Sequence, residues 1–198
     1  MKTRESGMPD QPTWDTFFDP EATLRALGLR PTHRDVADFG CGYGTFSIPA
    51  AKVANGAKVA NGIVYSFDID PSMIAATRAR AKAHGITNIR ASLCDFISDG
   101  TGLRDASVDY AMLFNILHAE NPDVLLREAW RILSSGGLLA IMHWNYDPTT
   151  PRGPSMSIRP KPGECREMAE KVGFELAGPE SNALPPYHYG LIMSRPGS

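Results

Sequence analysis

One short segment restricts the fold of this chain more than any other. An apolar run ends on Asp38 and passes at once into Gly40, Gly42 and Gly44. Glycine at alternate positions leaves the backbone amides uncovered, so that a ligand can lie directly on the chain, and it allows a sharp reversal from strand to helix. The segment therefore predicts a strand, a turn that binds a nucleotide-containing cofactor, and a helix, in that order.

The spacing of the glycines selects among cofactors. The dinucleotide fingerprint G-x-G-x-x-G requires a third small residue three positions after the second glycine, and Thr45 stands there when Gly40 and Gly42 are counted first. Counting one glycine later puts Ser47 at that position and leaves Gly40 without a role. Asp38 would repel a pyrophosphate, whereas it would attract an ammonium group. The pattern thus predicts a nucleoside that carries an amino acid.

The glycine turn resembles motif I of the class I S-adenosylmethionine-dependent methyltransferases, in which this loop wraps the methionine part of the cofactor. Three later segments resemble the family in the same order: residues 63–71, 89–96 and 107–118, each an apolar run that leads into polar residues. The resemblance covers about residues 36 to 144. It implies the cofactor S-adenosylmethionine, with S-adenosylhomocysteine as the product.

The resemblance also implies a role for individual residues. Asp68 would bind the ribose hydroxyls, whereas Asp70 precedes a proline and is expected to cap a helix. Asp95 would accept a hydrogen bond from the adenine amino group, and Phe96 or Ile97 would cover the ring. The predicted cofactor-binding residues are Asp38, Gly40, Cys41, Gly42, Gly44, Asp68, Ile69, Asp95, Phe96 and Asn115.

Candidate catalytic residues lie where predicted strands end beside the transferable methyl group. His118 follows the fourth predicted strand, His143 ends the fifth, and Tyr187 begins the last, where Tyr187 and Tyr189 share a face opposite His188. A thiolate accepts a methyl group without a base, whereas a hydroxyl, a ring carbon or an ammonium nitrogen must lose a proton. We expect in-line displacement with His118 as the first candidate for a base and His143 as the second. The alternative for each histidine is a packing or capping role, and we predict no metal ion.

Alternating apolar strands and helix-start signals predict a doubly wound α/β fold. Asp19, Asp70 and Asn121 each precede a proline, a pair that favours the start of a helix. Together with the family resemblance, this predicts a Rossmann-like methyltransferase fold. Its sheet is expected to be mostly parallel and seven-stranded, with an antiparallel last strand.

The chain is expected to form one methyltransferase domain at residues 13–198, after a flexible N-terminus at residues 1–12. Residues 147–163 contain five prolines and predict a long loop that covers a site or moves. Residues 51–56 are repeated without change as residues 57–62. We interpret the repeat as a surface extension after the first helix of the fold, without a role in function.

Composition restricts the partners. The formal net charge is −2 and no Lys/Arg cluster is present, which argues against a nucleic-acid surface. No segment resembles a signal peptide or reaches the length that spans a bilayer, and three separated cysteines fit a reducing compartment. We therefore expect a cytoplasmic protein whose partner is a small-molecule methyl acceptor, not a nucleic acid or a membrane. A homodimer is compatible with the sequence.

Several other functions were weighed. Residues 115–118 lack the Asn/Asp-Pro-Pro-aromatic tetrad of methyltransferases that modify amino groups of DNA and some proteins. Cys41, Cys94 and Cys165 lie in different elements, which argues against arsenic methylation by converging thiolates. A protein that binds S-adenosylmethionine without turning it over, as a sensor or partner subunit, stays open as the alternative. A nicotinamide oxidoreductase is the weakest of these possibilities.

Overall fold

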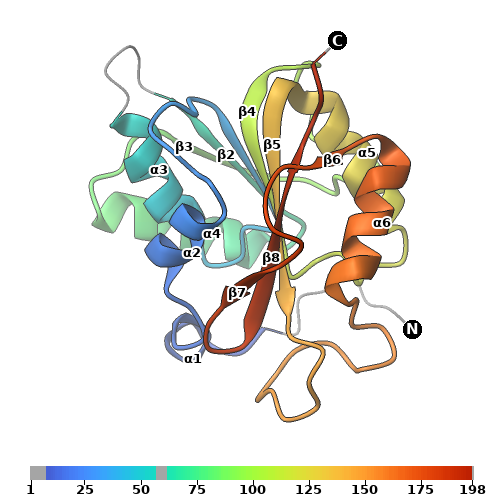
Figure 1. Cartoon of the computed structure of the whole chain (residues 1–198). Coiled ribbons are helices and arrows are strands. Elements are labelled where there is room, and N and C mark those ends of the chain that lie inside the picture. The colour runs from blue at the N-terminus through green and yellow to red at the C-terminus, as the bar shows by residue number, and fades with distance from the viewer. Residues whose placement is uncertain (1–7, 57–61, 198) are drawn as a thin grey trace.

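The computed structural model describes residues 8–56 and 62–197. A central sheet has helices on both faces, with α2, α3 and α4 on one side of it in Figure 1 and α5 and α6 on the other. The predicted α/β fold is therefore confirmed. Most of the second copy of the repeat, residues 57–61, lies outside the described residues.

Among residues 8–56 and 62–197 the sheet has eight strands in the order β3-β2-β1-β4-β5-β8-β6, and β7 pairs with β8 beside this path. The pairings among β1 to β5 are parallel, whereas β8 is antiparallel to each of its three partners. The predicted seven-stranded, mostly parallel sheet is thus extended by one short strand, β7. The strands are β1 Val36–Phe39, β2 Val64–Asp68, β3 Ile89–Leu93, β4 Val108–Phe114, β5 Leu133–Trp144, β6 Glu175–Leu176, β7 Asn182–Leu184 and β8 His188–Ser194.

The order of the strands indicates where in the molecule a ligand can bind. After β1 the chain runs outward to β2 and β3, and it then returns to the other side of β1 to form β4 and β5. In open α/β sheets a crevice forms outside the carboxyl ends of the strands at such a change of direction. A ligand site is therefore expected where β1 and β4 end.

Two of the three predicted aspartate or asparagine caps are observed at helix starts. Asp19 Oδ1 accepts a hydrogen bond from the backbone of Ala22, and Asp70 Oδ1 accepts one from Ser72. The side chain of Asn121 makes no such hydrogen bond, so helix α5, Pro122–Ile132, begins at its proline without a side-chain cap. The helices are α1 Gln11–Asp15, α2 Pro20–Ala26, α3 Ser47–Asn55, α4 Pro71–Ala83, α5 Pro122–Ile132 and α6 Pro162–Val172.

The core forms two apolar layers, one on each face of the sheet. Alternate residues of β5 supply the two layers, because successive side chains of a strand point to opposite faces. Leu139 and Ile141 belong to the layer that includes α5 and α6, whereas Ala140 and Met142 belong to the layer that includes α2 and α3. The central strands are thus covered on both sides, as a parallel sheet requires.

The structure differs from the sequence prediction near the N-terminus. Helix α1 begins at Gln11, inside the segment 1–12 that was expected to be flexible, and the Tyr43 hydroxyl donates a hydrogen bond to the carbonyl oxygen of Pro9. Residues 8–12 therefore belong to the folded unit, and residues 1–7 lie outside the described part. Within the described residues, every helix is too short or too polar to cross a bilayer.

Candidate active site

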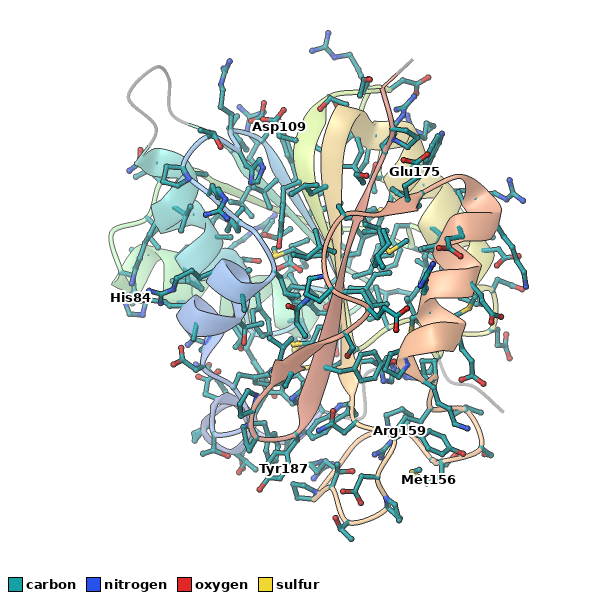
Figure 2. All side chains as sticks on the ribbon, viewed as in Figure 1. His84, Asp109, Met156, Arg159, Glu175 and Tyr187 are labelled. Atoms are coloured by element: carbon teal, nitrogen blue, oxygen red, sulfur yellow. The ribbon has the colours of Figure 1, made fainter. Side chains whose placement is uncertain are left out.

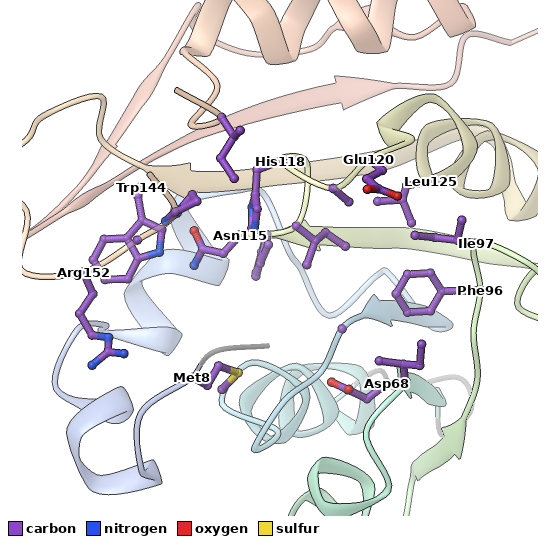
Figure 3. Close-up of a pocket in the computed structure, with 18 of the residues that line it drawn as sticks. Met8, Asp68, Phe96, Ile97, Asn115, His118, Glu120, Leu125, Trp144 and Arg152 are labelled. Carbon is purple, nitrogen blue, oxygen red and sulfur yellow. The ribbon is translucent and has the colours of Figure 1, made fainter. Parts of the chain in front are cut away.

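A cavity of about 390 Å³ lies at the carboxyl ends of the parallel strands. Its lining comes from the ends of β1 to β5, from Met8 and Pro9, and from the β5–α6 loop, residues 145–161. Figure 3 shows Asp68, Phe96 and Ile97 toward one end of this cavity and Trp144 and Arg152 toward the other. The cavity therefore has two ends with different chemistry.

The predicted turn is built on three glycines with positive φ: +73° at Gly40, +53° at Gly42 and +74° at Gly44. A Cβ at Gly40, which lines the cavity, would lie 3.2 Å from Ile116 Cγ2, and one at Gly42 would lie 2.9 Å from Met8 Cε. Residues other than glycine rarely adopt a backbone conformation with positive φ. The positive φ angles therefore favour glycine at all three positions of this turn.

Asp68 ties the end of β2 to the glycine turn. The backbone N–H of Gly42 donates to its Oδ2 at 2.9 Å, and the backbone N–H of Asp70 donates to its Oδ1 at 3.0 Å. Although Asp68 is only 5% exposed, it lines the cavity, and burial raises the pKa of its carboxyl group. Two backbone donors therefore hold the carboxylate of Asp68 in a fixed orientation, at the position where the resemblance predicts the residue that binds the ribose of the cofactor.

Asp38 does not line the cavity. Its carboxyl group is 3% exposed and accepts a hydrogen bond from the Ser47 hydroxyl at the start of α3. Burial raises its pKa to about 7, the Ser47 hydrogen bond opposes this, and the Asp68 charge adds to it. Cys41 is likewise buried, with its Sγ 3.7 Å from Thr77 Oγ1, and burial raises the pKa of its thiol. Both side chains lie behind the turn, where they contact Ser47 and Thr77 and not the cavity.

The segment after β3 forms the wall beside Asp68. Asp95, Phe96 and Ile97 all line the cavity, and the Asp95 carboxylate accepts a hydrogen bond from the backbone N–H of Ile97. The Phe96 ring packs edge-on against Phe39, with 5.3 Å between the ring centroids. An acidic side chain beside an apolar wall suits an adenine ring and its amino group.

Asn115 lies where β4 ends, with a positive φ of 58°. Its side chain lines the cavity, and its buried Oδ1 has no hydrogen-bond partner within the described residues. A buried polar atom without a partner costs free energy, and a ligand that donates a hydrogen bond would remove this cost. Together with the Asp68 carboxylate and the uncovered Gly40, this atom makes the cavity suitable for a polar, nucleoside-containing cofactor.

The two predicted histidines meet, although they lie on different elements. His118 lines the cavity, and its Nδ1 is 3.2 Å from Nε2 of His143. His143 does not line the cavity and is fully buried. Its burial, reinforced by His118, holds its pKa well below the usual value. His118 is therefore the member of the pair that can contact a ligand, and His143 stands behind it.

Tyr187, the third candidate, is not brought to this cavity. Its ring stacks on Trp144 at a centroid distance of 6.3 Å, just before β8 begins. The side chain of the next residue, His188, contacts Asn115, and burial lowers its pKa to about 3. The Tyr189 hydroxyl donates to the carbonyl oxygen of Pro160, and Tyr189 does not line the cavity either. We therefore give Tyr187 no part in the proposed chemistry.

Several residues that line the cavity carry no recognisable signal in the sequence. Met8 and Pro9 come from the segment expected to be flexible, and Arg152, Pro154 and Ile158 come from the β5–α6 loop. The proline content of this loop predicted a cover over a site, and that expectation agrees with its place in the cavity wall. No periodic pattern indicates which loop residues point inward, because irregular segments take their shape from tertiary contacts.

The guanidinium group of Arg159 holds the β5–α6 loop in place. It is buried at the base of the loop (Figure 2) and donates hydrogen bonds to four backbone carbonyl oxygens and one hydroxyl. The acceptors are the carbonyls of Asn145, Asp147, Arg152 and Pro154 and the hydroxyl of Thr150. One side chain thus organises a loop that lacks regular structure.

The strand order, the glycine turn and the fixed Asp68 carboxylate define a class of protein, the class I S-adenosylmethionine-dependent methyltransferases. A family model described as "Methyltransferase domain" matches residues 32–175, and the chain belongs to this family. Its cofactor is S-adenosylmethionine. The resemblance seen in the sequence is therefore confirmed.

Among curated proteins, the chain is similar to the ribosomal protein L11 methyltransferase of Haemophilus influenzae, with 46% identity over 41% of this chain and 30% of that protein. An uncharacterized 37.1 kDa protein in transposon TN4556 of Streptomyces fradiae is 28% identical over 78% of this chain and 45% of that protein. The chain spans less than half the length of these curated relatives.

Solved structures show the same fold. A SAM-dependent methyltransferase from Aquifex aeolicus superimposes with a TM-score of 0.79 at 22% identity, covering 94% of both chains. An S-adenosylmethionine-dependent methyltransferase from Mesorhizobium loti gives a TM-score of 0.65 at 18% identity, covering 88% of this chain and 96% of that one. At these identities the likeness establishes the fold and leaves the acceptor open.

Proposed function

We propose that this chain transfers the methyl group of S-adenosylmethionine to a small-molecule nucleophile, and that His118 removes the proton of the nucleophile. One observation carries the proposal: Asp68 and His118 line the same cavity of about 390 Å³. A space of this size suits a cofactor and a small acceptor better than a folded macromolecule.

The residues in the cavity suit the parts of the cofactor. Asp68 would bind the ribose hydroxyls, Asp95 the adenine amino group, and Phe96 with Ile97 one face of the ring. The turn at Gly40 would accommodate the amino-acid part. When bound, S-adenosylmethionine supplies a methyl group attached to a positively charged sulfur, which a nucleophile displaces in line.

The other end of the cavity would hold the acceptor. Trp14, Trp144 and Ile158 contribute apolar surface there, and Arg152 contributes a positive charge. These walls exclude water and align the acceptor, which is the main source of acceleration in a direct displacement. We therefore propose an apolar or aromatic acceptor, and an acidic group on it would be attracted by Arg152.

His118 supplies the proton acceptor. The ordinary pKa of histidine lies close to neutrality, so an imidazole takes a proton readily from a hydroxyl group whose oxygen is attacking carbon. A hydroxyl acceptor would need this step, whereas a thiol that is already ionised would not. We therefore expect transfer to a hydroxyl acceptor to depend on His118, and transfer to an ionised thiol to depend on it much less.

The test is transfer of labelled methyl groups to a panel of thiols, phenols and amines by the wild type and by His118→Ala. We expect His118→Ala to lose about 100-fold or more in kcat toward a phenol and much less toward a thiol at alkaline pH. His84→Ala is the matched control, because His84 is exposed and lies away from the β5–α6 loop, which Met156 and Arg159 mark in Figure 2.

Two outcomes would contradict the proposed function. One is binding of the cofactor without transfer to any member of the panel, which would favour a sensor or partner subunit. The other is methylation of a protein or nucleic acid under conditions in which every small molecule is rejected.

A further inference from the structure

The contact between His118 and His143 follows from the strand order. His118 lies in the segment after β4, and His143 is the second-last residue of β5, the parallel neighbour of β4. The imidazole rings meet edge to face at an interplanar angle of 84°, and Nδ1 of His118 is 3.2 Å from Nε2 of His143. This distance is that of a hydrogen bond, so one of the two nitrogens carries a proton and the other does not.

His143 is a neutral imidazole. It is 0% exposed, and its burial together with the nearby groups His118, His188 and Arg159 holds its pKa well below the usual value. The Trp144 backbone acts in the opposite direction. His143 therefore stays neutral beside His118, which borders the cavity.

The charged form of His118 allows only one arrangement of the hydrogen bond. An imidazolium carries protons on both nitrogens, so its Nδ1–H must find an acceptor. Nε2 of His143, 3.2 Å away, can accept this hydrogen bond only if His143 carries its own proton on Nδ1. If Nε2 of His143 carried the proton instead, two N–H groups would face each other when His118 became charged.

Packing alone does not explain a histidine at position 143. Its Nδ1 is buried and has no hydrogen-bond partner within the described residues. Such an atom lowers stability, and an apolar side chain would fill the same space without this cost. The polar side chain is therefore explained better by its contact with His118 than by the core around it.

We propose that His143 is a positioning residue for the base. Its Nε2 accepts a hydrogen bond from Nδ1–H of His118, which leaves Nε2 of His118 unprotonated toward the cavity. The inference rests on the proposed function, in which His118 takes the proton of the acceptor. In that step the bond between the acceptor heteroatom and its hydrogen breaks, an N–H bond forms at Nε2 of His118, and the electron pair stays on the heteroatom.

The direct test measures tautomers and requires no activity. The ¹⁵N chemical shifts of the imidazole nitrogens are recorded on the full chain with labelled histidine, at a pH above the ordinary histidine pKa, and His118→Ala and His143→Gln assign the signals. We expect a protonated Nδ1 and an unprotonated Nε2 for His118. A His118 protonated on Nε2 would overturn the inference even if the protein is an active methyltransferase.

A kinetic comparison separates positioning from a merely structural role. In His143→Gln the amide can offer an oxygen near the place of Nε2, whereas in His143→Leu the acceptor is lost. We expect His143→Leu to lower kcat toward a hydroxyl acceptor by about 10- to 100-fold, with KM and S-adenosylhomocysteine affinity unchanged. We expect His143→Gln to retain most of the wild-type kcat.

His84→Gln is the control for this comparison. Equal activity of His143→Leu and His143→Gln would contradict the inference. If the wild type transfers no methyl group, only the proposed function fails, and the tautomer of His118 still decides the inference.

Discussion

Asp38 is the second-last residue of β1 and Asp68 is the last residue of the neighbouring strand β2, but their carboxyl groups have different surroundings. Asp68 receives two backbone hydrogen bonds at the edge of the cavity, whereas Asp38 is buried behind the turn with Ser47. The sequence predicts both acids as cofactor ligands because both follow apolar runs. Only Asp68 has a place from which a direct contact with a ligand in the cavity is supported.

The buried carboxyl group of Asp38 predicts a pH dependence of stability. Its pKa is about 7 in the folded protein against 3.8 for an unperturbed group, so the folded state keeps a proton that the unfolded state releases. Stability from this group is therefore present below about pH 4 and is lost as the pH rises toward 7. At about 1.4 kcal/mol per pKa unit, the loss is on the order of 4 kcal/mol.

Urea unfolding of the wild type and of Asp38→Asn between pH 4 and 7 measures this effect. We expect the wild type to become less stable relative to Asp38→Asn as the pH rises, while Asp99→Asn, at an exposed position, follows the wild type. A difference between the wild type and Asp38→Asn that stays constant across this range would show that the burial of Asp38 has no such consequence.

At the scale of elements, the β5–α6 loop depends on Arg159. Lysine at this position keeps the charge but lacks the planar set of donors that reaches five acceptors. We expect Arg159→Lys to speed amide hydrogen exchange in residues 147–158 and to raise KM for the methyl acceptor, because the loop forms part of the cavity wall.

Hydrogen exchange followed by mass spectrometry checks this expectation, with Arg127→Lys on the exposed side of α5 as the control. Unchanged exchange in the loop of Arg159→Lys would mean that other contacts hold it. The affinity for S-adenosylhomocysteine should change less than KM for the acceptor, because the loop lies at the end of the cavity away from Asp68 (Figure 3).

Elements with a local signal were predictable from the sequence. The apolar run before Gly40 predicts β1, and the cap at Asp70 predicts the start of α4; both are observed. The three-residue strand β7 is too short to show a periodic pattern, although its partner β8 follows it within a few residues. The ordered segment at Pro9 is held by Tyr43, 34 residues along the chain, and such a contact is not encoded in any short window of the sequence.

The candidate site shows the same division. Asp68, Asp95 and Asn115 follow strand ends, and in a parallel sheet strand ends converge, so their presence in one cavity was predictable. The pairing of His118 with His143 was not, because it depends on the side-chain conformations of one residue in the segment after β4 and one residue near the end of β5. The resemblance to the methyltransferase family identified the cofactor, whereas the contact between the two histidines is seen in the structure alone.

At the scale of the whole molecule, we propose that a single cavity has a cofactor end and an acceptor end. The strand ends, the glycine turn and Met8, which lies beside Gly42, would form the cofactor end, and Trp14, Trp144 and the β5–α6 loop would form the acceptor end. Irregular segments change readily without disturbing the sheet. This division explains how the chain can be placed in its family while its acceptor is identified only by experiment.

The most direct test of this account is isothermal titration calorimetry with S-adenosylhomocysteine on the wild type, on Asp68→Ala and on Glu167→Ala, which removes an exposed carboxylate of α6. We expect one binding site in the wild type and in Glu167→Ala, and an affinity at least about 10-fold lower in Asp68→Ala, because two hydrogen bonds to a charged group are lost. Equal affinity of Asp68→Ala and the wild type, or no binding by the wild type, would contradict it.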